Sequence, residues 1–168
     1  MRTVASRSGY AAPTIYHYFG DKPGLIDAVL EERFGRLLRR LEGVTRGDDP
    51  ALYLAELARA FAQFGKDNPS HYRLLTLRSP GDRPPPSAER ARDLMERPLV
   101  ELESLGRLRG SDRDALLQTL WALLHGIISL TTSRPDYEWS EGLIDTAIDT
   151  FLNGVLQSPP PAAPATSG

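Results

Sequence analysis

Residues 9–30 read "GYAAPTIYHYFGDKPGLIDAVL". This stretch predicts two short helices, of residues 2–8 and 12–18, joined by a tight turn at Gly9, where a left-handed backbone lets one helix turn sharply into the next. A longer helix follows, and Asp21 is a good N-cap for it. A pair of short helices of this kind can place its second helix in the major groove of DNA.

The second short helix carries polar side chains at its exposed positions, Thr14, Tyr16 and His17. Their hydroxyl and imidazole groups can donate hydrogen bonds to phosphates, and Lys22 at the start of the next helix adds a positive charge. Taken singly, these residues could be ordinary surface residues of a helical bundle. Their spacing within one motif favours the interpretation that Tyr16 and His17 contact the DNA backbone.

This motif resembles the helix-turn-helix of TetR/AcrR-type transcriptional regulators over residues 2–41, with the family's spacing and no gap. The matching positions are Val4-Ala5, Gly9, Thr14-Ile15-Tyr16, Tyr18-Phe19, Lys22 and Leu25. In this setting the two aromatic residues before Gly20 are expected in the core. Farther along, "WALLHG", residues 121–126, resembles the Trp…His-Gly signature of one branch of TetR-type C-terminal domains.

Two departures from the family pattern matter. The family's motif is preceded by a further helix, so we interpret residues 1–41 as a truncated helix-turn-helix whose first helix is missing, and Met1 as an internal methionine of a longer natural protein. Without that helix, residues such as Ile15 and Phe19 should lose part of their apolar cover.

The second departure lies in the reading helix, where the family often has polar or basic residues. Alanine can contact a thymine methyl group and little else, so specificity should depend on Thr14, on Arg2 in the preceding helix and on DNA shape. The predicted DNA-binding set is Arg2, Ala11, Ala12, Pro13, Thr14, Tyr16, His17 and Lys22.

Composition limits the other classes of function. The 168 residues carry a net charge of −2, which excludes a chain-wide basic nucleic-acid binder, although residues 1–24 hold three basic side chains and one acidic one. The absence of cysteine excludes disulfides and thiolate metal sites, and the three histidines do not cluster, so we predict no metal, cofactor or catalytic set. Without a recognisable signal peptide or membrane-spanning run, we expect a cytoplasmic protein with no membrane contact.

Apolar residues recur at helical spacing nearly throughout, which predicts an all-α fold. The expected domains are a DNA-binding region over residues 1–41, a ligand-binding and dimerisation domain over 42–156, and a disordered tail over 157–168. The predicted elements after Asp21 are a helix ending before Gly43, a loop of 43–50, a helix ending before Asn68, a short helix of 72–77, a loop of 79–87, and helices of 88–109, 115–132 and 140–156.

The resemblance implies that the second domain binds an effector, which we expect to be small and apolar. Trp121 and His125 lie four residues apart on one helical face, and they fit a pocket wall and a hydrogen-bonded core histidine equally well. The residues selected as pocket lining are individually more often plain core. They are Phe61, Phe64, Tyr72, Met95, Trp121 and His125.

The last two predicted helices indicate a dimer. Residues 115–132 are apolar on nearly every side, the last helix has a wide apolar band, and one small subunit can hardly cover both. A four-helix interface between two copies would cover them. The predicted interface residues are Leu124, Ile128, Leu143, Ala147, Ile148 and Phe151.

The resulting hypothesis is a ligand-responsive transcriptional regulator, usually a repressor in this family, that binds a palindromic double-stranded operator as a homodimer and has no enzymatic activity. Two alternatives stay open. The chain could pair with a full-length relative and block that relative's DNA binding. It could also bind a small ligand and never contact DNA.

Overall fold

The computed structural model of the protein describes residues 2–70, 72, 83–110 and 112–157. Within that part of the chain seven α-helices and no strand occur, which confirms the predicted all-α fold. The helices are α1 (Arg2–Ser8), α2 (Ala12–Phe19), α3 (Lys22–Glu42), α4 (Pro50–Asp67), α6 (Pro86–Ser104), α7 (Arg113–Ser133) and α8 (Leu143–Val155).

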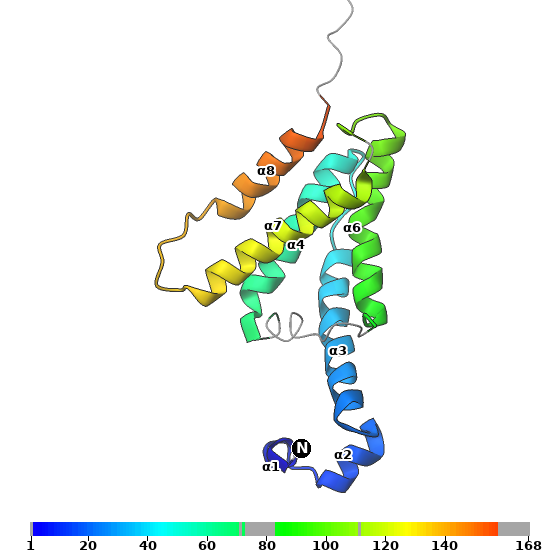
Figure 1. Cartoon of the computed structure of the whole chain (residues 1–168), viewed down its shortest axis with the longest axis vertical. Coiled ribbons are helices and arrows are strands. Elements are labelled where there is room, and N and C mark those ends of the chain that lie inside the picture. The colour runs from blue at the N-terminus through cyan, green and yellow to red at the C-terminus, as the bar shows by residue number, and fades with distance from the viewer. Residues whose placement is uncertain (1, 71, 73–82, 111, 158–168) are drawn as a thin grey trace, which may run out of the picture.

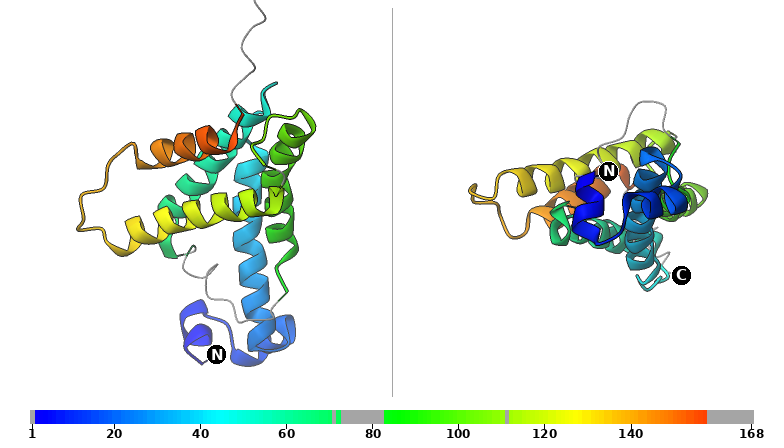
Figure 2. Two further views of the ribbon diagram at one scale, coloured as in Figure 1. Left: turned by 45° about the horizontal axis from the view of Figure 1, so that its top comes forward. Right: turned by 90° about the horizontal axis from the view of Figure 1, so that it is seen from below.

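Helix α3 is the axis of the molecule. Figure 1 shows α1 and α2 at one end of α3. Helices α4 and α6 pack against α3, and α7 and α8 pack in turn against α4. The same separation is visible after a 45° turn, where α1 and α2 still lie beyond the end of the bundle (Figure 2). One long helix therefore connects the N-terminal pair of helices to the bundle.

The turns at the N-terminal end follow the sequence prediction. Gly9 has a φ of 76°, and its N–H donates to the Ala5 carbonyl at 3.1 Å, so the left-handed turn between α1 and α2 is confirmed. Asp21 is the N-cap of α3, because its Oδ1 accepts a hydrogen bond from the Gly24 backbone N at 2.8 Å. The turn at Gly9 sets where α2 follows α1, and the cap at Asp21 sets where α3 begins.

The core of the bundle lies between α3, α4, α6, α7 and α8. Leucine and isoleucine at three- and four-residue spacing place one apolar face of each helix toward the others. Helix α4 is central, because it contacts all four of the other helices. The side chains with less than 2% exposure are Leu37, Leu41, Leu54, Leu57, Leu99, Leu102, Leu120, Leu124, Ile128, Ile148 and Pro98.

The start of α6 differs from the prediction. Residues 83–87 were expected to be loop, but α6 begins at Pro86, and Ser87 in its first turn is only 7% exposed. Proline is favoured in a first helical turn, so the proline-rich run starts the helix rather than delaying it.

The end of α6 also differs, because the helix stops at Ser104 instead of residue 109. Gly106 adopts a φ of 65°, and the chain then pairs with the segment after α8 through an isolated bridge between Leu108 and Leu156. The Gln157 backbone N donates to the Arg107 carbonyl at 2.8 Å. This pairing is between residues distant in sequence, so helical periodicity could not reveal it.

Two predictions fall largely outside the described residues. Of the short helix expected at 72–77 only Tyr72 is described, and of the tail expected at 157–168 only Gln157 is described.

Helix α8 begins at Leu143, three residues later than expected.

Helix α7 is unusually apolar. It is 21 residues long with a mean hydropathy of 1.4 over its most apolar 18-residue window, so by length and composition it could cross a membrane, and the sequence-based exclusion of such a helix was too strict. Its contacts with α4, α6 and α8 make it a core helix of this bundle. Only 28% of that window is buried within the subunit, however, so much of α7 is uncovered.

Candidate functional site: the N-terminal reading helix and an internal cavity

Helix α2 presents a polar surface at the end of the molecule. It starts after Ala11, whose ψ of 143° is extended, and Pro13 occupies its first turn without interrupting a hydrogen bond. Gly20 with a φ of 73° ends the helix, and its N–H donates to the Tyr16 carbonyl at 2.8 Å. The backbone therefore isolates a two-turn helix that lies away from the bundle (Figure 1).

The predicted DNA-binding side chains on and around α2 are mostly accessible. Tyr16 is 45% exposed, and His17 and Lys22 are exposed as well. Ala11 and Pro13 are exposed and Ala12 and Thr14 are half-buried, while the side chain of Arg2 lies outside the description. The structure thus brings these positions together on one end of the molecule, and their contact with DNA stays a prediction.

The apolar side of α2 is only partly covered. Ile15 is 6% exposed, as expected for a core residue. Tyr18 and Phe19 are 77% and 38% exposed, so the expectation that both lie in the core was wrong. In the described chain, the two short helices offer too little surface to bury three large side chains.

A mostly apolar cavity of about 240 Å³, partly open to solvent, lies in the bundle between α3, α4, α6 and α7. Four of the six residues predicted to line a pocket do line it: Phe61, Met95, Trp121 and His125. Phe64 and Tyr72 are buried but are not in its wall. The remaining lining residues are Phe34, Leu37, Pro84, Ala88, Glu89, Ala91, Arg92, Leu117, Leu120 and Leu124.

His125 is the polar centre of this cavity wall. Its ring centroid lies 5.4 Å from those of Phe61 and Tyr72 and 5.5 Å from that of Trp121. The Nδ1 atom of His125 is 2.6 Å from the Tyr72 hydroxyl, which also lies 3.2 Å from the His125 carbonyl oxygen. Both proposed roles of His125, as pocket wall and as hydrogen-bonded core residue, are therefore met by one arrangement.

Burial shifts both partners of this hydrogen bond toward their neutral forms. It lowers the pKa of His125 to about 4 and raises the pKa of Tyr72 to about 12. At neutral pH the pair is therefore an uncharged imidazole and an uncharged phenol. Such a pair can donate and accept hydrogen bonds without placing a charge in the cavity.

Two family profiles match separate parts of the sequence. The profile described as "Bacterial regulatory proteins, tetR family" matches residues 1–29, and the profile described as "Tetracyclin repressor-like, C-terminal domain" matches residues 54–151. The chain belongs to the TetR family of regulators. No curated protein matches the sequence.

Solved structures share the fold of this TetR-family chain. A protein of unknown function from Rhodococcus sp. RHA1 superimposes with a TM-score of 0.76 at 24% identity, covering 93% of this chain and 84% of its own. A TetR-family transcription regulator from Marinobacter aquaeolei VT8 gives 0.71 at 16% identity, with 92% and 83% covered. The TetR-family regulator PfmR from Thermus thermophilus gives 0.67 at 19% identity, with 89% and 85% covered.

The family assignment supports a DNA-binding transcriptional regulator with a helix-turn-helix in its N-terminal region. TetR-family regulators commonly act as dimers, and their domains indicate a regulator rather than an enzyme. Among the described residues, no group of three histidine, aspartate or glutamate side chains could hold a metal ion.

The residues predicted for the dimer interface of this TetR-family chain are mostly covered by the subunit itself. Leu124, Ile128, Ile148 and Phe151 are 1%, 0%, 1% and 7% exposed, and Leu124 is part of the cavity wall. The remaining two, Leu143 and Ala147, are half-buried. The apolar bands on α7 and α8 therefore face α4 and each other, and other residues of α7 stay exposed.

Sequence reasoning missed the contributions of α3 and α6 to the cavity. Phe34 and Leu37 have the helical spacing of an apolar face on α3, but nothing in that spacing distinguishes cavity wall from core. Ala88, Ala91 and Arg92 lie in the first two turns of α6, beyond the proline-rich run. Only the packing of α6 against α3 and α7 places them around one space.

A second hollow, an open groove of about 610 Å³ beside α4 and α8, is polar. Arg59 in its wall pairs with Asp145 at 2.6 Å and with Glu56 at 2.7 Å. The whole lining holds three basic and three acidic side chains, so its net charge is zero: Arg40, Arg59, Lys66, Glu56, Glu141 and Asp145.

Proposed function

We propose that this protein is a ligand-responsive repressor that acts in the cytoplasm and binds a palindromic operator as a homodimer. Residues 1–41 would form the DNA-binding region, with Tyr16, His17 and Lys22 on phosphates and Thr14 near base edges. Residues 42–156 would bind the effector and the second subunit.

The observation that carries the proposal is the double role of α3. Its middle contributes Phe34 and Leu37 to the cavity, and its first residue, Lys22, follows α2 after a two-residue turn. A helix is stiff over this length, so a movement of the cavity wall would be carried to the reading helix. Ligand binding and DNA binding would then each favour a particular position of α3.

The energetics set a requirement on the effector. A ligand shifts the equilibrium only by its difference in affinity between the DNA-bound and released forms, and tight binding to both forms shifts nothing. A tenfold loss of operator affinity needs a difference of about 1.4 kcal/mol. By linkage, operator DNA must weaken effector binding by the same factor.

The uncovered face of α7 supports a homodimer. Ala115, Ala122 and Ser129 are exposed on α7 at steps of seven residues, which places them on the same side of the helix. Small side chains allow another helix to approach closely. A twofold dimer would place one α2 in each half-site of an operator, at a separation of about 34–36 Å.

Fluorescence anisotropy on DNA selected from a random library by the purified protein tests the DNA-binding part. We expect Lys22→Ala to weaken binding to all selected sequences and to reduce the salt dependence by about one counterion, because it removes one phosphate contact. Lys66→Ala on α4 is the matched control and should leave both quantities unchanged. Selection of no DNA by a folded dimer at low salt would contradict the proposal, and retained ligand binding would then favour a ligand-sequestering protein.

A further inference from the structure

The apolar cavity has an unusually uniform wall. Eleven of its fourteen described lining residues are apolar, and the three others are Glu89, Arg92 and His125. Phe34, Phe61 and Trp121 add aromatic faces from α3, α4 and α7. A ligand here would be bound mainly by burial of its apolar surface.

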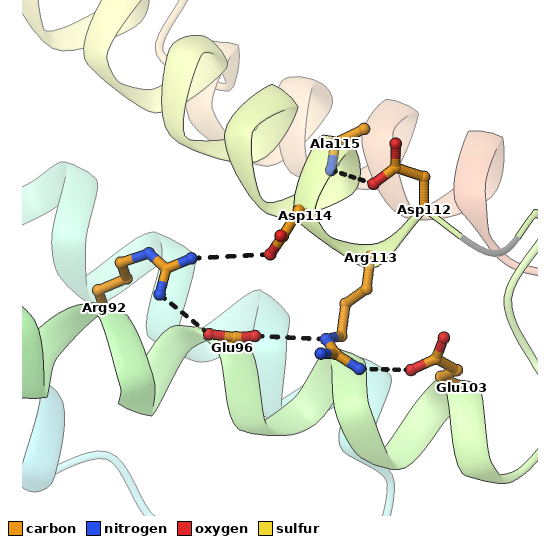
Figure 3. A network of polar contacts seen from close by, with 7 residues as sticks. All are labelled: Arg92, Glu96, Glu103, Asp112, Arg113, Asp114 and Ala115. Carbon is orange, nitrogen blue, oxygen red and sulfur yellow. Dashed lines mark hydrogen bonds and ion pairs between the residues drawn. The ribbon is translucent and has the colours of Figure 1, made fainter.

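The two charged residues of the wall are already paired. Arg92 lies 3.2 Å from Glu96 Oε2 and 3.7 Å from Asp114 Oδ1, and Figure 3 shows this guanidinium within a network that continues through Arg113. Glu89 lies 4.0 Å from Arg83. The side chains of Glu89 and Arg92 are about half exposed and lie toward solvent. The apolar remainder of the wall offers no partner to an ionised ligand, and taking an unpaired ion out of water costs several kcal/mol. The described wall therefore favours a neutral ligand.

One hydrogen-bonding position remains in the wall. Nδ1 of His125 is engaged by the Tyr72 hydroxyl at 2.6 Å, whereas Nε2 has no partner among the described residues. If the Tyr72 hydroxyl donates to Nδ1, then Nε2 carries the proton and donates. If the Tyr72 hydroxyl donates instead to the His125 carbonyl oxygen at 3.2 Å, then Nδ1 carries the proton and donates to the hydroxyl oxygen, and Nε2 is an acceptor. The ligand can thus present either an acceptor or a donor to Nε2.

The volume limits the size of the ligand. An apolar cavity of about 150 Å³ is known to hold one benzene ring, and this one measures about 240 Å³. Pockets for drug-sized ligands start at about 300 Å³. One or two fused rings therefore fit the space.

We propose that the cavity binds a neutral aromatic molecule of one or two rings that carries a single hydroxyl or carbonyl group, with that group on His125 Nε2. The inference rests on the proposed ligand response, because it names the class of effector. His125 is then the residue that distinguishes a ligand with one polar group from the plain hydrocarbon.

Three probes of nearly the same shape test this on the purified full chain: 2-naphthol, naphthalene and 2-naphthoate, measured by isothermal titration calorimetry at pH 8. We expect 2-naphthol to bind about two- to tenfold more tightly than naphthalene, the ratio that one net hydrogen bond provides. The anionic 2-naphthoate should bind more weakly than either. These comparisons use only the unmodified protein, so they do not depend on whether a variant folds.

His125→Phe should abolish the preference for 2-naphthol over naphthalene while naphthalene binding persists. Tyr72→Phe, the control that keeps the ring and the Nε2 position, should retain that preference. The inference is overturned if 2-naphthoate binds as tightly as 2-naphthol, if none of the three binds, or if folded His125→Phe keeps the preference. These measurements use no DNA, so their failure concerns only the class of ligand. Failure of the proposed function would instead appear in a DNA-binding measurement, as 2-naphthol binding that leaves the DNA affinity unchanged.

Discussion

The carboxylate of Glu31 accepts two hydrogen bonds from Ser87, one from Oγ at 2.6 Å and one from the backbone N at 3.2 Å. Glu31 is half-buried on α3, and Ser87 is 7% exposed in the first turn of α6. The pair caps α6 and connects it to α3 beside Ala88, which lines the cavity. It is therefore a direct polar link between the cavity wall and the helix that leads to α2.

We expect Glu31→Ala to lower the free energy of unfolding by about 1–3 kcal/mol, because a buried hydroxyl and a helix N-terminal N–H lose their acceptor. Urea denaturation followed by circular dichroism measures the change. Glu42→Ala is a matched control, since Glu42 also joins α3 to α6 through an exposed pair with Arg90 at 2.8 Å. That substitution should cost at most about 1 kcal/mol, and equal losses for the two glutamates would contradict the role assigned to Glu31.

Gly24→Ala should impair DNA binding with little effect on the bundle. A Cβ atom at Gly24 would lie 2.1 Å from the Phe19 carbonyl oxygen, so the turn between α2 and α3 would have to open. We expect weaker binding to every selected sequence, measured by anisotropy, while urea unfolding of the bundle stays within about 1 kcal/mol of the unmodified protein. Unchanged DNA affinity would show that the angle between α2 and α3 does not matter.

Gly65→Ala should destabilise the bundle itself. A Cβ atom there would lie 2.7 Å from Cδ1 and 2.8 Å from Cγ2 of Ile128, so α4 and α7 would be forced apart. Overpacking of this kind costs about 1–3 kcal/mol of unfolding free energy. Gly154→Ala on α8 is the control, because its Cβ meets nothing within 4 Å, and it should leave stability unchanged or raise it by up to about 1 kcal/mol.

His125 should make stability depend on acid pH. Its pKa is lowered by burial to about 4, against about 6.5 in an unfolded chain. The unfolded state therefore binds the proton first as pH falls. The free energy of unfolding should decrease as the pH falls from about 6.5 to about 4, and this group should not affect it above that window.

Urea unfolding at pH 7.5 and pH 5 checks this dependence. His125→Phe should show a smaller loss between the two pH values than the unmodified protein. Tyr72→Phe should keep the acid loss, because burial raises the pKa of Tyr72 to about 12 and that group affects stability only above about pH 10. Identical pH profiles for His125→Phe and the unmodified chain would rule out this role of His125.

Ala122→Arg should weaken self-association. Ala122 is exposed on the uncovered side of α7, where an arginine would keep a second α7 at a distance and bring two positive charges together. Sedimentation velocity should shift toward the monomer. Leu52→Arg is the control, because Leu52 is a 67% exposed apolar residue on α4, away from α7's free face. Equal sedimentation of both variants and the unmodified protein would contradict a dimer interface on this side of α7.

Local physical chemistry made several features readable from the sequence. The left-handed turn at Gly9, the cap at Asp21 and the helical period of α3, α4 and α7 each depend on residues within about one turn of one another. The spacing of Thr14, Tyr16 and Lys22 in one motif was equally local, and it was enough to identify the family. The polar end of α2 follows from the same short stretch.

Other features depended on contacts between distant residues. Helical spacing shows which face of α7 and α8 is apolar, but it does not show what covers that face, so Ile128 and Ile148 were assigned to a partner although the subunit buries them. Helical spacing likewise could not predict that Phe34 lines the cavity or that Glu31 accepts hydrogen bonds from Ser87, because both depend on the packing of α3 against α6. Neighbours along the chain therefore account for the cap at Asp21, the turn at Gly9 and the N-terminal motif, whereas the ends of α6 depend on residues distant in sequence. The tertiary structure alone decided which apolar faces enclose the cavity and which side of α7 stays free, because each depends on how helices far apart in sequence pack together.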